Sequence, residues 1–366
     1  MMADTRHSVL ADTCGDRQIH HAGWVVVDVD TVIKDGFIEV EDHVIQAVHT
    51  RRPSGTIVNH GPGVLMPPLV NAHLHLELSA LKGMLPLDKG FKTWVSLLLE
   101  KREALGRAYL TEKAHQAALT MQMSGNLCVG DISTLGITAP VLETVGLSGV
   151  CFHEHLGTDI GEHAVFSGPR LSCSLAGHAP HSSSPELLRT LKLKTRQNHL
   201  PFSIHVAESA DETVFIREKK GLWADFLTLR GIDFSDWDIG AKTPLAYVHG
   251  LGLLDKDTIV VHALNMDAQD MALLSHAKAQ VCLCPRSNLN LHQKLPDISG
   301  IMALGIEPAL GTDSLASCDS LDILDEMQFV RHHFPHLTDT AIFLMGTVNG
   351  ARALGIDHFC GTLACG

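Results

Sequence analysis

Two histidines separated by one residue are the first feature of this sequence that could perform chemistry. His73 and His75 come at the end of an apolar run that begins at Val64 and reads as a buried strand. Residues two apart in a strand point to the same side, so both imidazoles would face one opening. Two neutral imidazoles placed in this way can bind one divalent cation. A short His-x-His sequence also arises by chance, so the pair needs partners elsewhere in the chain.

Further candidate ligands come at the ends of three later apolar runs. His205 and His262 close two of them, and Asp313 lies in the segment LGTDS that closes the third. Glu208 follows His205 by three residues. Histidines and a carboxylate that converge on one opening form the mixed nitrogen and oxygen shell that suits zinc or ferrous iron. The alternative is that buried His and Asp side chains only hydrogen-bond to one another, which explains one such residue more easily than four.

Apolar strands that alternate with longer helical patterns must position these residues. Eight strands are predicted, at residues 64–77, 126–134, 149–157, 170–181, 201–209, 258–265, 279–288 and 307–314. Helices are predicted between and after them, at residues 91–107, 111–124, 139–145, 185–199, 212–229, 267–276, 298–305, 320–334 and 338–354. Eight alternations over this length predict an α/β protein with a closed (β/α)8 TIM barrel, and an open doubly wound sheet is the alternative. The polar residues fall at the carboxyl ends of the strands, where such a barrel builds its active site.

The residues that precede the first barrel strand have a different pattern. Short strands and turns over residues 22–58 predict a small β domain. We therefore expect the small β domain at residues 1–62 and the metal-dependent barrel at residues 63–355. Residues 356–366 are expected to return towards the small domain.

Composition and charge exclude several classes of function. The 366 residues carry a net charge of −13 with scattered Lys and Arg, so we expect no nucleic acid partner and no membrane partner. No apolar run reaches the ~18 residues of a membrane span, and the polar segment at residues 1–16 lacks the apolar core of a signal peptide. The nine cysteines, an odd number found largely in apolar runs, fit a reducing compartment. We predict a cytoplasmic protein whose partner is a small-molecule substrate.

Five short phrases carry a resemblance to a known family. In order along the chain, VLMPPLVNAHLHLE, IHVAES, VVHALN, CPRSNL and GTDSLAS resemble the amidohydrolase superfamily, and most closely its metal-dependent deaminase and chlorohydrolase branch. The resemblance covers approximately residues 20–364. It implies that one divalent metal ion, zinc foremost and iron as the alternative, is bound by His73, His75, His205 and Asp313. Binuclear members have a carboxylated lysine at the end of the fourth strand, whereas this strand ends GHAPHSSS, so a single ion is expected.

The same resemblance implies hydrolytic deamination of an aminated heterocycle. A metal ion lowers the pKa of bound water to about 7 and so supplies hydroxide at neutral pH. His262 and Asp313 would hold and deprotonate this water, and Glu208 would protonate the ring nitrogen beside the attacked carbon. For Glu208, the alternative is an ordinary acidic residue at a helix amino terminus.

Loops at the barrel mouth should supply the substrate contacts. The candidates are Glu77, Trp94, His181, Arg286, Asn288 and Ser314. Glu77 should face the same side as His75 and could accept hydrogen bonds from a donor-rich ligand. His181 lies in APHSSSPELL, which is similar to a phrase of adenosine-type deaminases, although the same segment reads as a helix cap.

A second His-x-His pair and one further histidine are left open. His153 and His155 end the third predicted strand, but the family pattern gives them no partners. We interpret them as facing the substrate or supporting the metal ligands. The role of His178 is not assigned by the pattern.

The chain looks most like the aminodeoxyfutalosine deaminases of menaquinone biosynthesis, which act on an adenine nucleoside. Deamination of S-adenosylhomocysteine, methylthioadenosine or adenosine is the first alternative, followed by guanine or cytosine deamination and triazine hydrolysis. Hydrolysis of a cyclic amide and a non-catalytic scaffold rank below these. Relatives continue into strands that complete a β-sandwich, so we expect an incomplete small domain, whose edge strands favour covering or a homo-oligomer.

Overall fold

The computed structural model describes residues 17–161 and 164–366, so the segment in which we expect no signal peptide, residues 1–16, lies outside the described residues. The chain divides into two compact units. One comprises Met1–Pro67 with Thr362–Gly366, and the other comprises Pro68–Gly361. None of the helices in the described ranges is long and apolar enough to cross a membrane.

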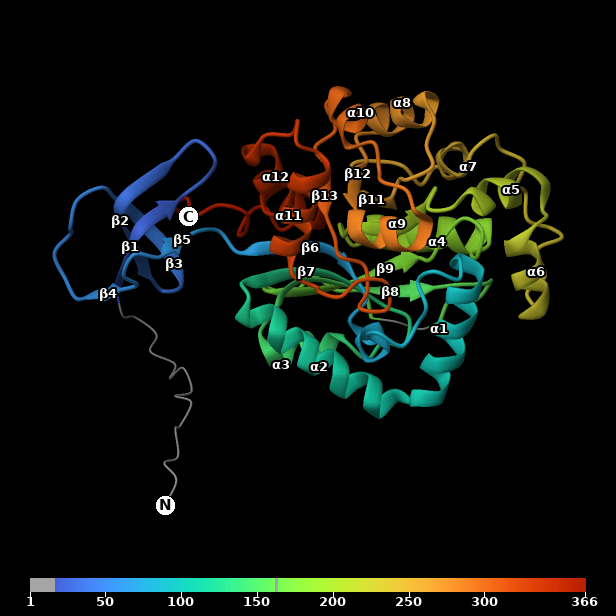
Figure 1. Ribbon diagram of the computed structural model, residues 1–366, viewed down its shortest axis with the longest axis horizontal. Coiled ribbons are helices and arrows are strands. Elements are labelled where there is room, and N and C mark those ends of the chain that lie inside the picture. The colour runs from blue at the N-terminus through green and yellow to red at the C-terminus, as the bar shows by residue number, and fades with distance from the viewer. Residues whose placement is uncertain (1–16, 162–163) are drawn as a thin grey trace, which may run out of the picture. The chain divides into compact units, whose positions relative to one another are not determined.

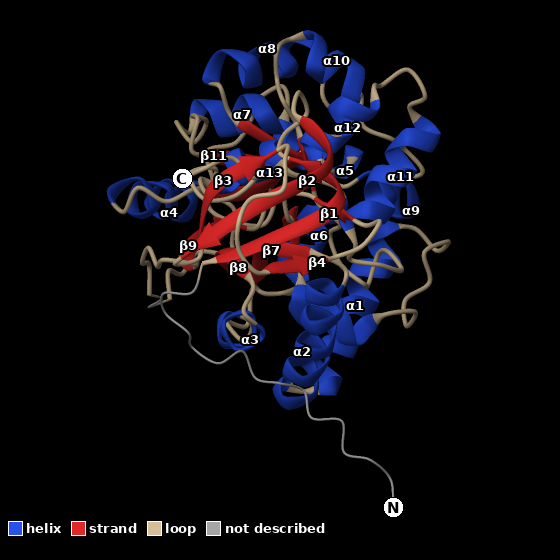
Figure 2. Cartoon of the chain, turned by 90° about the vertical axis from the view of Figure 1, so that its left-hand side faces the viewer, coloured by secondary structure: helices blue, strands red, loops and turns tan. Residues whose placement is uncertain are grey.

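The small unit is built on one sheet (Figure 2). Its strands are β1 (Gln18–Val26), β2 (Val32–Glu41), β3 (Val44–His49), β4 (Ile57–Asn59) and β5 (Val64–Leu65). The order is β3-β2-β1-β4, and β5 also pairs with β1. Val25, Val27 and Ile38 form its apolar core. The last residues of the chain join this unit, because the Leu363 amide donates to the carbonyl oxygen of Val27 at 2.8 Å.

Eight parallel strands form the wall of the larger unit, and helices surround them (Figure 1). The strands are β6 (Leu69–Leu74), β7 (Asn126–Ser133), β8 (Ser148–His155), β9 (Leu171–Gly177), β10 (Phe202–Val206), β11 (Thr258–His262), β12 (Gln280–Leu283) and β13 (Ala309–Leu310). They follow one another in this order, and a bridge between Leu74 and Asp313 joins the first to the last. The predicted (β/α)8 barrel is therefore confirmed.

Helices follow most strands of the barrel. They are η1 (Leu76–Leu81), a 3-10 helix, and the α-helices α1 (Phe91–Leu105), α2 (Arg107–Met123), α3 (Ala139–Val145), α4 (Pro185–Gln197), α5 (Ala210–Glu218), α6 (Leu222–Leu229), α7 (Pro244–Gly250), α8 (Ala268–Ala277), α9 (Pro285–His292), α10 (Ile298–Ala303), α11 (Ile323–His333), α12 (Asp339–Met345) and α13 (Val348–Leu354).

One predicted strand is wrong in its second half. The strand expected at residues 279–288 ends at Leu283, and the residues from Pro285 onward form α9. Proline is favoured at the first helical position, because its φ is already helical and its missing N–H is not needed there. The phrase CPRSN is therefore a helix start rather than a strand end, which changes where its side chains lie.

The predicted helix at residues 212–229 is also wrong, because it divides into α5 and α6. Lys219, with φ 53°, adopts the left-handed conformation that ends α5, and Gly221 has φ 83°. Left-handed residues of this kind commonly terminate helices. Helix α7 was not predicted, although its signals are present: Thr243 caps the Ala246 amide, and Pro244 occupies the first turn.

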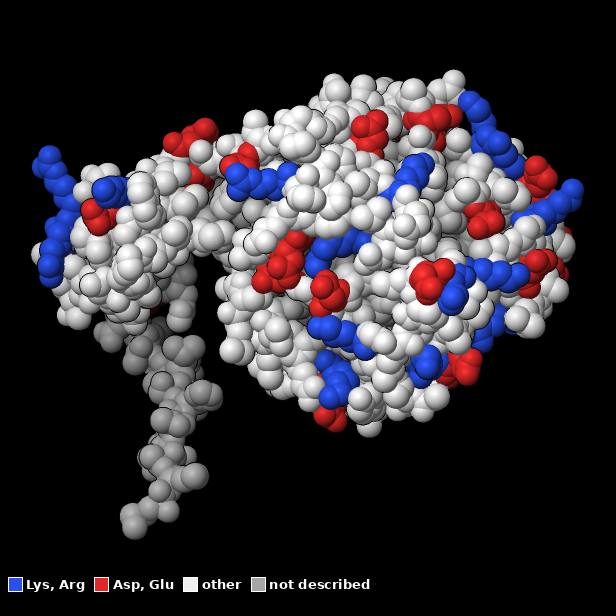
Figure 3. Space-filling model, viewed as in Figure 1, with Lys and Arg blue, Asp and Glu red and all other residues white. Residues whose placement is uncertain are grey.

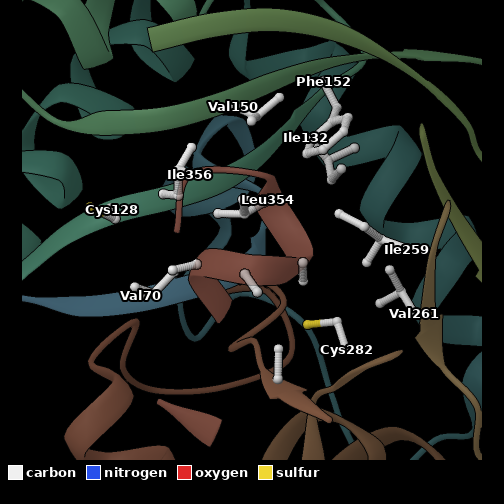
Figure 4. Close-up of a cluster of buried hydrophobic side chains, with 14 of the residues drawn as sticks. Val70, Cys128, Ile132, Val150, Phe152, Ile259, Val261, Cys282, Leu354 and Ile356 are labelled. Atoms are coloured by element: carbon white, nitrogen blue, oxygen red, sulfur yellow. The ribbon is translucent and has the colours of Figure 1, made fainter. Parts of the chain in front are cut away.

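Aliphatic side chains fill the interior of the barrel below its mouth (Figure 4). Inward residues such as Val150 and Val261 form one cluster with Leu354 of α13. The helix packs closely on β6, because a Cβ at Gly350 would lie 2.8 Å from the nearer methyl carbon of Val70. The packed interior leaves the polar chemistry to the carboxyl ends of the strands.

Charged side chains of both signs are interspersed on the face of the larger unit drawn in Figure 3. That face presents no continuous basic surface of the kind that binds a polyanion. The absence of a nucleic acid partner stays a prediction.

Candidate metal centre and active site

The barrel mouth brings together all the side chains predicted to bind metal. His73 Nε2 lies 3.2 Å from His205 Nε2, and His75 Nε2 lies 3.6 Å from Asp313 Oδ1. Ligand atoms of His73, His205 and His262 lie within 4.8 Å of one another, as do those of His73, His75 and Asp313. Side chains from β6, β10 and β11 and from the turn after β13 thus share one location.

Unusual backbone angles at the strand ends direct these side chains into the mouth. His262 has φ 72°, Asp313 has φ 62° and Ala207, which precedes Glu208, has φ 58°. Non-glycine residues adopt positive φ at some energetic cost, and such residues are concentrated at functional sites. The amides of Thr312 and Asp313 both donate to the carbonyl oxygen of His73, which holds the two ends of the barrel sheet together.

The histidines of the cluster are in the protonation state that binds a metal cation. Burial lowers the pKa of His73, His75 and His205, so these rings are neutral, which is the form that binds metal. His205 Nδ1 lies 2.7 Å from the carbonyl oxygen of His178 and must donate to it, which leaves a lone pair on Nε2. Two nitrogens bound to one tetrahedral ion at ~2.1 Å lie about 3.4 Å apart. The 3.2 Å between His73 Nε2 and His205 Nε2 therefore fits a shared metal ion.

Two serines that the sequence analysis missed hold the carboxylate. Asp313 Oδ2 accepts hydrogen bonds from Ser287 Oγ at 2.5 Å and from Ser317 Oγ at 3.0 Å. Burial raises the pKa of Asp313, although His262 acts in the opposite direction. With Oδ2 engaged, Oδ1 remains free of these serines and faces His75. Both serines were within recognised phrases, CPRSNL and GTDSLAS, so the sequence did contain their signal.

Glu208 stands at the edge of this cluster. Its Oε1 lies 3.0 Å from His292 Nε2 and 3.8 Å from His262 Nε2. Burial alone would raise the pKa of Glu208, but His262 and the hydrogen bond with His292 outweigh it and lower the pKa. The buried carboxylate of Glu212 fixes this turn by accepting from the Glu208 amide at 3.0 Å. His292 was missed because the segment that carries it was read as following a strand rather than as the end of α9.

An apolar cavity opens onto these groups. Its walls come mainly from one face of α1 and from α6, and its polar lining includes most of the cluster. The lining residues are His75, Glu77, Leu78, Phe91, Trp94, Val95, Leu98, Leu99, Arg102, Thr134, Glu154, Leu156, His178, His181, Ser182, His205, Glu208, Trp223, Phe226, His262 and Asp313. The rings of His181 and Trp223 are stacked with centroids 3.8 Å apart. Aromatic and aliphatic walls with a few polar groups at one end are typical of small-molecule sites.

Three of the predicted substrate residues line this cavity, namely Glu77, Trp94 and His181. Trp94 uses its indole N–H internally, donating to the carbonyl oxygen of Ala316 at 3.0 Å. Ser314 is not among the lining residues, because it is buried beside Ser317, with 3.4 Å between the two Oγ atoms. Asn288 is buried in α9, where its side-chain amide nitrogen lies 3.2 Å from His262 Nδ1.

Arg286 also lies outside the cavity lining, for a reason that follows from the start of α9. The helix turns its side chain onto Glu326 of α11, where Arg286 Nε donates to Oε2 at 2.6 Å. Its other nitrogens donate to Asp319 Oδ1 and to the carbonyl oxygen of Ser320. Removing one partner of a buried ion pair costs about 3–5 kcal/mol. Arg286 therefore joins α9 to α11, and its contact with the substrate stays a prediction.

The segment His153–Glu154–His155 presents its central residue to the cavity. Glu154 lines the cavity and His153 and His155 do not. Successive side chains of a strand point to opposite faces, so Glu154 and the two histidines cannot face the mouth together. The His-x-His pattern pointed to His153 and His155, and the carboxylate of Glu154 between them was not predicted.

Comparison with known proteins identifies the family. The family model described as amidohydrolase family matches residues 164–366, more than half of the chain. The chain belongs to the amidohydrolase family. The resemblance seen in the sequence is therefore confirmed, and family membership together with deaminase relatives makes this amidohydrolase a hydrolase of carbon–nitrogen bonds.

Two curated relatives of this amidohydrolase are deaminases. The aminodeoxyfutalosine deaminase of Deinococcus radiodurans is 30% identical over 319 residues, which cover 80% of this chain and 73% of the relative. The 5-methylthioadenosine/S-adenosylhomocysteine deaminase of Pyrococcus furiosus is 28% identical over 360 residues, which cover 91% of this chain and 81% of the relative.

Two solved structures share the fold. Helicobacter pylori aminofutalosine deaminase in complex with methylthio-coformycin has a TM-score of 0.83 at 24% identity, covering 95% of this chain and 90% of its own. An adenosine deaminase from Xanthomonas campestris with bound zinc has a TM-score of 0.76 at 22% identity, covering 95% and 82%.

Proposed function

We propose that this amidohydrolase replaces the amino group of an adenine nucleoside by oxygen and releases ammonia. The observation that carries the proposal is the convergence of His73, His75, His205 and Asp313 at one end of an aromatic-walled cavity, with Glu208 beside them. The deaminase relatives support the choice of an adenine nucleoside. Aminodeoxyfutalosine is the foremost substrate, and methylthioadenosine or S-adenosylhomocysteine is the alternative.

These four residues would hold one divalent cation, zinc foremost. A bound cation of this kind lowers the pKa of water to about 7, so that hydroxide is available at neutral pH. A second ion beside Glu154, His178 and His205 is disfavoured, although their ligand atoms also lie within 4.8 Å of one another. His205 Nδ1 is already committed to the carbonyl oxygen of His178, and His178 Nδ1 lies 2.6 Å from Ser182 Oγ.

The chain's own residues would orient water and move protons. His262 and Asp313 would hold the attacking water on the side of the purine carbon that bears the amino group and would take its proton. Glu208 would deliver a proton to the adjacent ring nitrogen, which neutralises the charge that attack places on the ring. The carbon–nitrogen bond to the amino group then breaks, and ammonia leaves with a proton returned through Asp313. Water and the aminopurine thus give the oxopurine and ammonia.

An ammonia-release panel tests the proposed function. The purified 366-residue chain, reconstituted with zinc, is assayed for ammonia release from aminodeoxyfutalosine, methylthioadenosine, S-adenosylhomocysteine, adenosine, guanine and cytosine. A cyclic amide is assayed separately for ring opening, because its hydrolysis releases no ammonia. We expect a higher kcat/KM for ammonia release from the adenine nucleosides than from guanine or cytosine, because the relatives are named for adenine nucleosides. Hydrolysis of the cyclic amide alone, or release from guanine alone, would overturn the assignment.

His292 should act as a positioning residue for Glu208. Because the 3.0 Å contact with His292 Nε2 holds the carboxylate, His292→Leu should lower kcat about tenfold with little change in KM. His292→Gln can still donate to Glu208 and should recover most of this loss. Steady-state kinetics on the best substrate, with the thermal midpoint of each variant, check the expectation. Equal losses in the Leu and Gln variants would point to packing instead.

A further inference from the structure

We infer that Arg102 binds a carboxylate of the substrate and so selects nucleosides with an acidic substituent. The inference rests on the proposed function, because it assigns a further substrate contact in the same cavity. Arg102 is the one Lys or Arg among the residues that line the cavity.

The position of Arg102 follows from the spacing of α1. Trp94, Leu98 and Arg102 are each four residues apart, so they lie along one face of the helix. All three line the cavity. This face therefore presents an aromatic and aliphatic wall that ends in a single guanidinium group.

The guanidinium group has unused donors. Its ion pair with Glu77 spans 3.7 Å between Arg102 Nη1 and Glu77 Oε1, which is beyond hydrogen-bond range. Beyond this ion pair, the Arg102 guanidinium makes no side-chain hydrogen bond with the residues that the structure describes. A guanidinium carries five N–H donors in a planar fork, a geometry that matches a carboxylate. Its side chain is 17% exposed, so the donors are screened from bulk solvent but not sealed off.

Neighbouring carboxylates orient Arg102 without saturating it. Glu77 is buried, and its Oε2 already accepts from Ser133 Oγ at 2.9 Å and from the Leu135 amide at 3.0 Å. Glu154 Oε2 accepts from Thr134 Oγ1 at 2.7 Å. Glu77 thus balances the charge of Arg102 while the fork remains available to a ligand.

The chemistry of the cavity then separates two kinds of nucleoside. A substituent that carries a carboxylate can pair with Arg102, and the apolar face of α1 can cover the carbon atoms between. A neutral substituent, such as a methylthio group, contacts the same wall but leaves the guanidinium without a partner. Charge-assisted hydrogen bonds of this kind correspond to roughly a tenfold to hundredfold difference in binding.

Matched substrates test the inference directly. Aminodeoxyfutalosine, which carries a benzoate, is compared with its methyl ester and with methylthioadenosine, using the wild type, Arg102→Met and Arg102→Lys. We expect the wild type to prefer the free acid to the ester about tenfold to hundredfold in kcat/KM, chiefly through KM. Arg102→Met should abolish this preference, so that the free acid and its methyl ester react with kcat/KM values within about twofold of each other. Arg102→Lys should keep part of it, because the charge remains and the fork is lost.

The control and the contrary outcomes keep the inference separate from the proposed function. Arg331→Met alters an exposed arginine of α11 and should change neither the preference nor the rates. If the wild type deaminates the acid and the ester equally well, the inference fails while the deaminase function stands. The inference also fails if Arg102→Met lowers kcat/KM equally for all three substrates, because that result would indicate that Arg102 contacts the sugar they share. If no adenine nucleoside releases ammonia, the proposed function fails first. The acid-versus-ester comparison needs only the wild type, so misfolding of a variant does not prevent the test.

Discussion

Replacing Glu208 by glutamine should lower kcat for deamination by about 10²- to 10⁴-fold, the usual contribution of a positioned proton donor and acceptor. Glutamine keeps the size of the side chain and can still contact His292 and His262, which lie 3.0 Å and 3.8 Å from Glu208 Oε1. It cannot carry a proton from water to the ring nitrogen. The loss should therefore fall on kcat, with a smaller change in KM. Steady-state ammonia release with the best substrate of the panel measures it.

A matched control is available one helix further on. Glu218 ends α5 on the exposed surface, and Glu218→Gln should leave kcat unchanged. Metal content should be the same in the wild type and in both variants, because Glu208 is not among the four proposed ligands. If Glu208→Gln has the same kcat as the wild type, the proposed proton transfer by Glu208 is contradicted. A variant that had lost its metal would show that Glu208 supports the metal site instead.

The metal cluster was predictable from the sequence because two regularities place its residues together, one of the β-strand and one of the barrel. Alternation along a strand sets which residues face the mouth, and the barrel topology sets that all eight carboxyl ends meet there. His73 and His75 satisfy the first condition, and His205, His262 and Asp313 satisfy the second. These constraints are local in sequence or general to the fold, so a single sequence contains them.

The residues that contact this cluster were harder to predict, because their positions depend on where helices begin and how they pack. Arg286 was expected at the mouth because CPRSN read as a strand end, and the helix start at Pro285 turns it onto Glu326 instead. Once α9 exists, His292 reaches Glu208 across 84 residues of sequence, a contact that no local pattern announces. Arg102 became visible only when the packing of α1 placed one face of that helix against the cavity.

Removal of the metal should abolish deamination and lower the thermal stability of the barrel. Without a cation, the neutral rings of His73 and His205 keep their Nε2 atoms 3.2 Å apart in a buried site with no positive charge between them. A ligand present at a thousandfold excess over its dissociation constant stabilises the native state by about 4 kcal/mol. For a unit of this size, that free energy corresponds to a shift of about 7 °C in the unfolding midpoint.

The experiment combines chelation with one ligand variant. Dialysis of the full chain against a chelator should reduce ammonia release to background and lower the midpoint, and stoichiometric zinc should restore both. Ferrous iron added in place of zinc, without oxygen, distinguishes the two candidate metals by the activity recovered. His205→Ala should behave as the chelated protein does and should not respond to zinc. His249→Ala, which removes an exposed histidine of α7, should match the wild type in metal content, midpoint and rate. A chelated chain that keeps both its activity and its midpoint would contradict the metal centre. Because the four proposed ligands come from three separate strand ends, loss of any one ligand should lower both quantities together.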